Sequence, residues 1–78
     1  MAKENILIIG ACGQIGEELT LALRKQYGGD AVIATDVKPE HPLLQETGPF
    51  KTLDVLDKAA LQAIIIKHNI KQIYLLAA

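Results

Sequence analysis

Three glycines and one aspartate have the residue types and spacing of a ligand-binding site. Gly10, Gly13 and Gly16 recur every third residue, and Asp36 lies 20 residues beyond the last of them. Glycine permits tight turns and close backbone approaches that a Cβ prevents. If a helix starts near Gly13, the N–H groups of its first turn have no partner in the helix and, with the helix dipole, favour an anion. The spacing therefore predicts a site for a phosphate group.

Each of these residues has a distinct expected role. Gly10 would end a strand in a tight turn, Gly13 would let a ligand approach the backbone, and Gly16 would let the helix pack closely on the sheet. The N–H groups of Gly13, Gln14 and Ile15 would face a diphosphate. Asp36 would accept hydrogen bonds from an adenosine ribose. A chance recurrence of glycines is the alternative, but the apolar run before them and the helical pattern after them favour dinucleotide binding.

The carboxylate also predicts which dinucleotide binds. Asp36 would repel a 2′-phosphate, which favours NAD over NADP. Lys38 would soften that preference if its side chain faced the ligand, although a solvated loop lysine is the simpler interpretation. Cys12 lies in the glycine turn, where a small residue beside the cofactor is expected, and no histidine is positioned to activate its thiol.

Alternating apolar runs and amphipathic segments must position these residues. We expect strands at residues 5–9, 31–35, 50–53 and 72–77, helices at 13–27 and 58–68, and one helical turn at 43–46 within the loop 37–49. Continuous rather than alternating apolarity is typical of parallel strands covered on both faces. The pattern predicts an α/β fold: the N-terminal portion of a Rossmann-type open parallel sheet, with strand order 3-2-1-4 and helices on both faces.

The helical spacing also predicts which side chains face the core. The expected inward face of the first helix comprises Ile15, Leu19, Ala22 and Leu23. The expected inward face of the second comprises Leu61, Ile64, Ile65 and His68. Asp57 is the expected N-cap of the second helix, and Asn69 is its expected stop.

Composition excludes several classes of function. The chain has 78 residues, a formal net charge of −1 and 4 % aromatic residues, which argues against nucleic-acid binding. One cysteine cannot form an internal disulfide, so a reducing compartment fits, and the apolar runs are too short to span a membrane. We therefore expect a cytoplasmic protein. His41 and His68 lack metal-ligand spacing, so no metal site is expected.

The last predicted strand is expected to be incompletely covered. No polar turn or helix follows it, which would leave Ile73, Tyr74, Leu75 and Leu76 partly exposed. Complete proteins usually protect an apolar sheet edge. We therefore expect residues 1–78 to be the N-terminal part of an NAD-binding domain, with the rest of that domain and the substrate domain absent.

Four segments resemble one known family over essentially the whole chain. GACGQIG at 10–16, DV at 36–37, LDVLD at 53–57 and LLAA at 75–78 resemble the extended, epimerase-like short-chain dehydrogenases/reductases. Within that family, the run KENILIIGACGQIGEELTLALRKQYG and the segment GPFKTLDVLD are most similar to the NAD-dependent L-threonine 3-dehydrogenases. The resemblance implies a parent enzyme that oxidises L-threonine to 2-amino-3-ketobutyrate and forms a homodimer.

The resemblance also implies further cofactor contacts. Asp54 would contact the adenine, with the Val55 backbone beside it, and Val37 would follow the ribose acid. From its position alone, Asp54 is equally well explained as the residue that starts a turn. Leu76, Ala77 and Ala78 would line the middle of the cofactor.

The family's chemistry requires residues that this chain lacks. Hydride leaves a substrate carbinol carbon for the nicotinamide while a tyrosine, assisted by a lysine four residues later, acts as base. Tyr27 is followed at that distance by Ala31, and Tyr74 by Ala78, so the chain itself is expected to be catalytically inert. A nucleotide-sugar epimerase or dehydratase, an NAD-sensing regulator and a remnant without useful affinity remain alternatives.

Overall fold

The computed structural model describes residues 5–76. In chain order, the elements are β1 (Asn5–Ile9), α1 (Gln14–Tyr27), a 3₁₀ turn (Gly29–Ala31), β2 (Val32–Asp36), α2 (Pro42–Thr47), β3 (Phe50–Thr52), α3 (Lys58–Lys67) and β4 (Ile70–Leu75). All expected elements are present. The largest boundary difference is in β4, which begins two residues before the expected strand.

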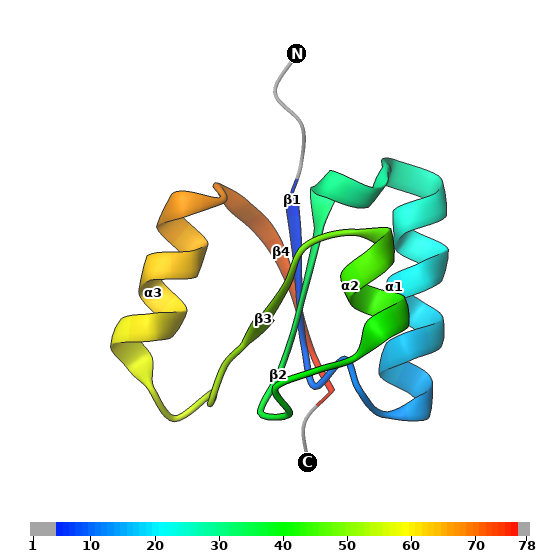
Figure 1. Cartoon of the computed structure of the whole chain (residues 1–78). Coiled ribbons are helices and arrows are strands. Elements are labelled where there is room, and N and C mark those ends of the chain that lie inside the picture. The colour runs from blue at the N-terminus through cyan, green and yellow to red at the C-terminus, as the bar shows by residue number, and fades with distance from the viewer. Residues whose placement is uncertain (1–4, 77–78) are drawn as a thin grey trace.

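The strands form one parallel sheet in the order β3-β2-β1-β4. Leu7 of β1 lies opposite Ile33 of β2 on one side and Ile73 of β4 on the other. Helices α1 and α2 cover one face of the sheet, and α3 covers the other (Figure 1). The predicted α/β class, strand order and two-sided cover are confirmed.

A separate apolar cluster lies on each face, because neighbouring side chains of β1 point in opposite directions. The cluster under α1 and α2 contains Ile6, Ile8, Ala11, Leu23, Val32, Ala34 and Leu44. The cluster under α3 contains Leu7, Ile9, Ile33, Leu53 and Ile64. Burial on both faces explains why β1 and β2 read as continuous apolar runs rather than alternating ones.

The expected inward face of α1 was wrong in part. Ile15 is 73 % exposed, and Ala22 is exposed as well. Gly16, Thr20 and Leu23 are buried. The rotation of α1 is set by Gly16, which must face the backbone of the preceding turn because no side chain fits there. Ile15, the residue that precedes Gly16, is thereby turned to solvent.

Arg24 is the fourth buried residue of α1, at 5 % exposure, and it joins three elements. Its Nε and Nη2 donate to the carbonyl of Val32, and Nη2 also donates to the carbonyl of Pro49. Its Nη1 donates to the carbonyl of Leu44 and to the hydroxyl of Thr47. The guanidinium therefore fixes the α2 segment against α1 and the start of β2.

Helix α3 has the expected ends. The carboxylate of Asp57 accepts a hydrogen bond from the N–H of Ala60 at 3.1 Å, and Asn69 adopts φ 51°, the left-handed conformation that stops a helix. Ile64 is buried, and Leu61 and Ile65 pack beside it, as the spacing predicts.

The outer strand β4 is partly uncovered, as expected. Ile73 is 49 % exposed, Leu75 61 % and Leu76 37 %, while Tyr74 is half-buried. Tyr74 packs against the apolar cluster under α1 and α2, which explains its partial burial.

Candidate cofactor-binding site

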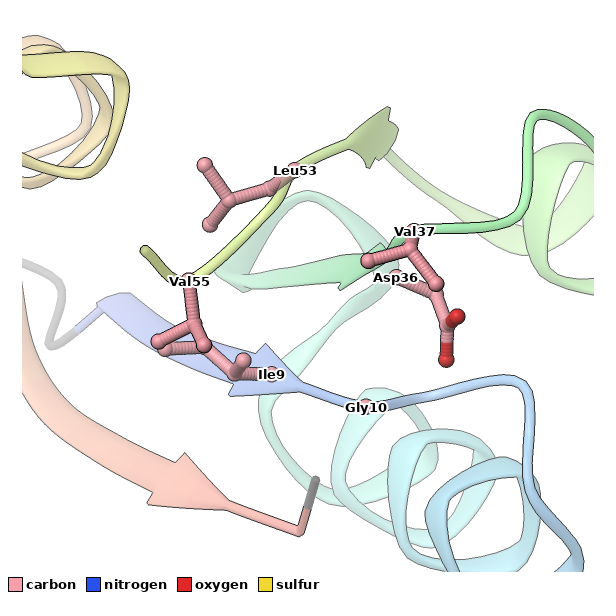
Figure 2. A pocket seen from close by; sticks show the side chains of 6 residues that line it. All are labelled: Ile9, Gly10, Asp36, Val37, Leu53 and Val55. Atoms are coloured by element: carbon pink, nitrogen blue, oxygen red, sulfur yellow. The ribbon is translucent and has the colours of Figure 1, made fainter. Parts of the chain in front are cut away.

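A cavity lies at the sheet edge where the carboxyl ends of β1, β2 and β3 meet. Its volume is about 230 Å³, and it is lined by Ile9, Gly10, Asp36, Val37, Leu53 and Val55. Figure 2 shows Asp36 directed toward the loop that joins β1 to α1, whereas Val55 lies beside Ile9. The cavity therefore has one charged, polar end and one apolar end. Ligands of open α/β sheets bind at this edge.

The glycine turn starts with a conformation that favours glycine. Gly10 has φ 89°, so the chain leaves β1 in the left-handed region. The N–H groups of Gly10 and Ala11 then both donate to the carbonyl of Thr35, each at 2.9 Å. The turn is thereby fastened to β2, as the expected role of Gly10 requires.

The other two glycines have different surroundings. A Cβ on Gly16 would lie 2.4 Å from the carbonyl oxygen of Gly10 and 2.8 Å from the Cα of Ala11. Only a glycine permits this packing. A Cβ on Gly13 would meet nothing within 4 Å. The space over Gly13 is open, as it must be if a ligand is to approach the backbone there.

The first turn of α1 presents its N–H groups to the outside. Gly13 is the N-cap and provides no side-chain cap, and Gln14 and Ile15 are exposed. The N–H of Glu17 donates to the carbonyl of Gly13 at 2.8 Å and begins the helical hydrogen bonding. The preceding amides have no partner within the helix, which is the arrangement that binds a phosphate.

The carboxylate of Asp36 is fixed by backbone donors. The N–H of Cys12 donates to Oδ2 at 2.9 Å, and the N–H of Lys38 donates to Oδ1 at 3.2 Å. Partial burial raises the pKa of Asp36, but the backbone N–H groups of Cys12, Lys38 and Val37, with the Lys38 charge, outweigh it and lower the pKa. The charged carboxylate is therefore maintained, and its remaining lone pairs are available to ribose hydroxyls.

The thiol of Cys12 is not an activated nucleophile. Burial and the charge of Asp36 raise its pKa, which leaves the thiol protonated. Its role in the site is that of its backbone N–H, which links the glycine turn to Asp36.

The segment after β3 contributes apolar residues rather than a charge. Leu53 and Val55 line the cavity, while the carboxylate of Asp54 accepts a hydrogen bond from the N–H of Leu56 at 2.9 Å, as in the turn interpretation. An adenine contact by Asp54 stays a prediction. Sequence reasoning missed Leu53 and Ile9, although both stand at the carboxyl ends of predicted strands, a position that could have identified them.

Of the three predicted residues at the end of the chain, the structure describes one. The N–H of Leu76 donates to the carbonyl of Ile9 at 2.8 Å, which places Leu76 at the carboxyl end of β1. Ala77 and Ala78 lie outside the described residues. Their expected contacts with the middle of the cofactor stay a prediction.

A metal site and a membrane-spanning helix are both absent from the described residues. Residues 5–76 contain no group of three or more histidine, cysteine, aspartate or glutamate side chains that could hold a metal ion. No helix in this range is both long enough and apolar enough to cross a membrane.

Comparison with known proteins decides the family. Residues 6–78 match the model of the NAD dependent epimerase/dehydratase family. This chain belongs to that family. A relative from Staphylococcus haemolyticus, described as an uncharacterized epimerase/dehydratase, is 49 % identical over 63 residues, which is 80 % of this chain and 20 % of the relative. The family implies a nicotinamide-dinucleotide cofactor.

Solved structures of two L-threonine dehydrogenases share the fold of this family member. The enzyme from Clostridium difficile is 41 % identical with a TM-score of 0.88, over 100 % of this chain and 25 % of the other. The GalE-like enzyme from Cupriavidus necator, in its holo form, is 43 % identical with a TM-score of 0.86, over 95 % of this chain and 24 % of the other. The chain thus spans about a quarter of the length of these enzymes.

Proposed function

We propose that this chain forms the adenosine-diphosphate half of the NAD site of an L-threonine 3-dehydrogenase. The remaining part of the NAD-binding domain and the substrate domain would belong to the longer parent enzyme. In this proposal the chain holds the cofactor but does not itself carry out the reaction, and the parent is a cytoplasmic homodimer.

The observation that carries the cofactor half of the proposal is the hydrogen bond from the N–H of Cys12 to Asp36. It joins the glycine turn, which leads into the free N–H groups of the first turn of α1 and the open space over Gly13, to the carboxylate at the end of β2. A diphosphate bound to the turn and a ribose bound to Asp36 would therefore be held at neighbouring positions. The fixed negative charge also disfavours the 2′-phosphate of NADP.

The apolar end of the cavity suits the adenine ring. Ile9, Val37, Leu53 and Val55 line it, and none of these side chains has a polar group that needs a partner. A flat aromatic base buries its apolar faces against such side chains, which contributes to the free energy of binding. The residues present therefore fit adenosine diphosphate: apolar walls for the base, a carboxylate for the ribose and backbone N–H groups for the phosphates.

Similarity supports the choice of substrate. The two solved L-threonine dehydrogenases are 41 % and 43 % identical to this chain over nearly all of its length. In the parent enzyme, NAD would accept the hydride released from the hydroxyl-bearing carbon of L-threonine, and the hydroxyl proton would pass to a base outside this chain. A nucleotide-sugar epimerase or dehydratase is the second candidate, because the curated relative from Staphylococcus haemolyticus is described as an epimerase/dehydratase.

Calorimetric titration of the full chain with ADP-ribose, NAD and NADP tests the cofactor half. Asp36→Ala should weaken binding of ADP-ribose by about 5- to 150-fold, which corresponds to the ~1–3 kcal/mol of a lost hydrogen bond to a charged group. Asp30→Ala is the matched control, because it removes the same charge from an exposed residue outside the cavity. Equal affinities of the two variants would refute the ribose role of Asp36.

The proposed substrate can be tested only with the longer parent enzyme. NADH formation, followed by absorbance, should occur with L-threonine and not with nucleotide sugars. Turnover of a nucleotide sugar without turnover of L-threonine would favour the second candidate.

A further inference from the structure

His41 connects helices α1 and α2 through its side chain. Its Nε2 lies 3.0 Å from Oε2 of Glu17 in the first turn of α1. Its Nδ1 accepts a hydrogen bond from the N–H of Leu44 at 3.4 Å and so caps α2. The side chains of His41 and Glu17 are 17 % and 37 % exposed, so the contact is partly shielded from water.

The two contacts of the imidazole determine where its proton lies. The N–H of Leu44 can only donate, so Nδ1 must accept. In the neutral ring, the proton is then on Nε2, which donates to the carboxylate of Glu17. The tautomer follows from this hydrogen-bond network. His41 is consequently a cap for one helix and a hydrogen-bond donor to the other.

The carboxylate of Glu17 lies close to the proposed phosphate site, so its position affects ligand binding. Glu17 is the acidic residue in the first turn of α1, the turn that presents free N–H groups to a diphosphate. A carboxylate is attracted by the same groups and repels a phosphate. The charge of Glu17 also acts on the glycine turn: together with burial and the charge of Asp36, it raises the pKa of Cys12. An unrestrained Glu17 would therefore compete with the ligand.

We propose that His41 is a positioning residue for diphosphate binding, which holds the carboxylate of Glu17 toward α2 and away from the free N–H groups of α1. This inference rests on the proposed cofactor site. It assigns to the β2–α2 connection a second role, because that segment also carries Val37, which lines the cavity. The His41 side chain would thus affect the phosphates of the ligand without touching them.

Two substitutions separate the two contacts of His41. His41→Asn keeps a side-chain acceptor for the α2 cap but is too short to reach Glu17. His41→Gln keeps a side-chain N–H donor that is long enough to reach Glu17, but glutamine is a poorer N-cap for α2 than asparagine. We expect His41→Asn to weaken binding of ADP-ribose by about three- to tenfold, the scale of one like charge beside a partly solvated phosphate. His41→Gln should retain most of the affinity.

A double-mutant cycle with Glu17→Gln identifies the cause. In the Glu17→Gln background, His41→Asn should no longer weaken ADP-ribose binding, because the competing charge has been removed. Binding of adenosine, which lacks phosphates, should be the same in all variants. A loss of equal size in both backgrounds, or an equal loss for adenosine, would show that His41 acts only on the structure and would overturn the proposal.

The unsubstituted chain separates this inference from the proposed function. If it binds ADP-ribose and His41→Asn binds equally well, the role of His41 is refuted and the cofactor site stands. If it does not bind ADP-ribose, both are refuted. Thermal unfolding of each variant accompanies the titrations, and His41→Asn should unfold within a few degrees of the unsubstituted chain because its α2 cap is retained.

Discussion

Replacing Gly13 by alanine should separate ligand binding from folding. Gly13 has φ −72° and ψ 166°, a conformation that any residue adopts, and its added Cβ would meet nothing within 4 Å. Two small effects oppose each other: alanine is a poorer N-cap than glycine, but it reduces the conformational freedom of the unfolded chain by ~0.4–1 kcal/mol. We therefore expect the free energy of unfolding to change by less than about 0.5 kcal/mol.

Binding should respond much more strongly than stability. The added methyl group would occupy the open space in which a diphosphate approaches the first turn of α1. Losing one hydrogen bond from a backbone N–H to a charged phosphate costs about 1.5–3 kcal/mol. At 1.4 kcal/mol for each tenfold change, the dissociation constant for ADP-ribose should rise by about 10- to 150-fold.

The assay combines urea unfolding with calorimetric titration, and Gly16→Ala is the comparison. A Cβ on Gly16 would lie 2.4 Å from the carbonyl oxygen of Gly10, so that variant should lose about 1–3 kcal/mol of unfolding free energy. Unchanged ADP-ribose affinity in Gly13→Ala would refute the proposed position of the diphosphate. Equal destabilisation of the two variants would refute the open space over Gly13.

Three further predictions concern stability. Arg24→Ala should lower the free energy of unfolding by about 3 kcal/mol, of the ~4–12 kcal/mol expected at this size, because the buried carbonyls of Val32 and Leu44 lose their donors. Lys25→Ala, on the exposed side of α1, should change it by less than about 0.5 kcal/mol in the same urea titration. Asp57→Ala should cost about 1 kcal/mol through the lost α3 cap, and Asp57→Asn should restore most of it; equal losses would argue against capping. Burial and two nearby lysine charges lower the pKa of His68, so the folded state favours the neutral ring. The contribution of His68 to the free energy of unfolding should be complete above the unfolded pKa of about 6.5 and should decrease as the pH falls through that value. His68→Gln should remove this pH dependence.

The elements and their order were predictable because they depend on local patterns. Continuous apolar runs identified the parallel strands, and the glycines marked the change from strand to helix. The strand order followed from the Rossmann-type arrangement that this alternation and the glycine turn indicate. The cap at Asp57 and the left-handed stop at Asn69 are likewise confirmed, since both depend on a few adjacent residues.

The rotation of α1 was not predictable from its apolar spacing. The pattern favoured a face containing Ile15, but the contact of Gly16 with Gly10 and Ala11 fixes the helix and exposes Ile15. Backbone packing between two segments overrides local hydrophobicity there. The prediction treated Gly16 as a packing residue without using that contact to orient the helix.

The sequence by itself determined the local chemistry: a glycine turn that a strand enters and a helix leaves, and a carboxylate at the end of the second strand. Only the tertiary structure decided which groups meet. It connected Cys12 to Asp36, enclosed Arg24 among carbonyl groups and brought His41 to Glu17. These contacts join residues that lie 8 to 25 positions apart, and no local spacing predicts them because they depend on how separate elements pack.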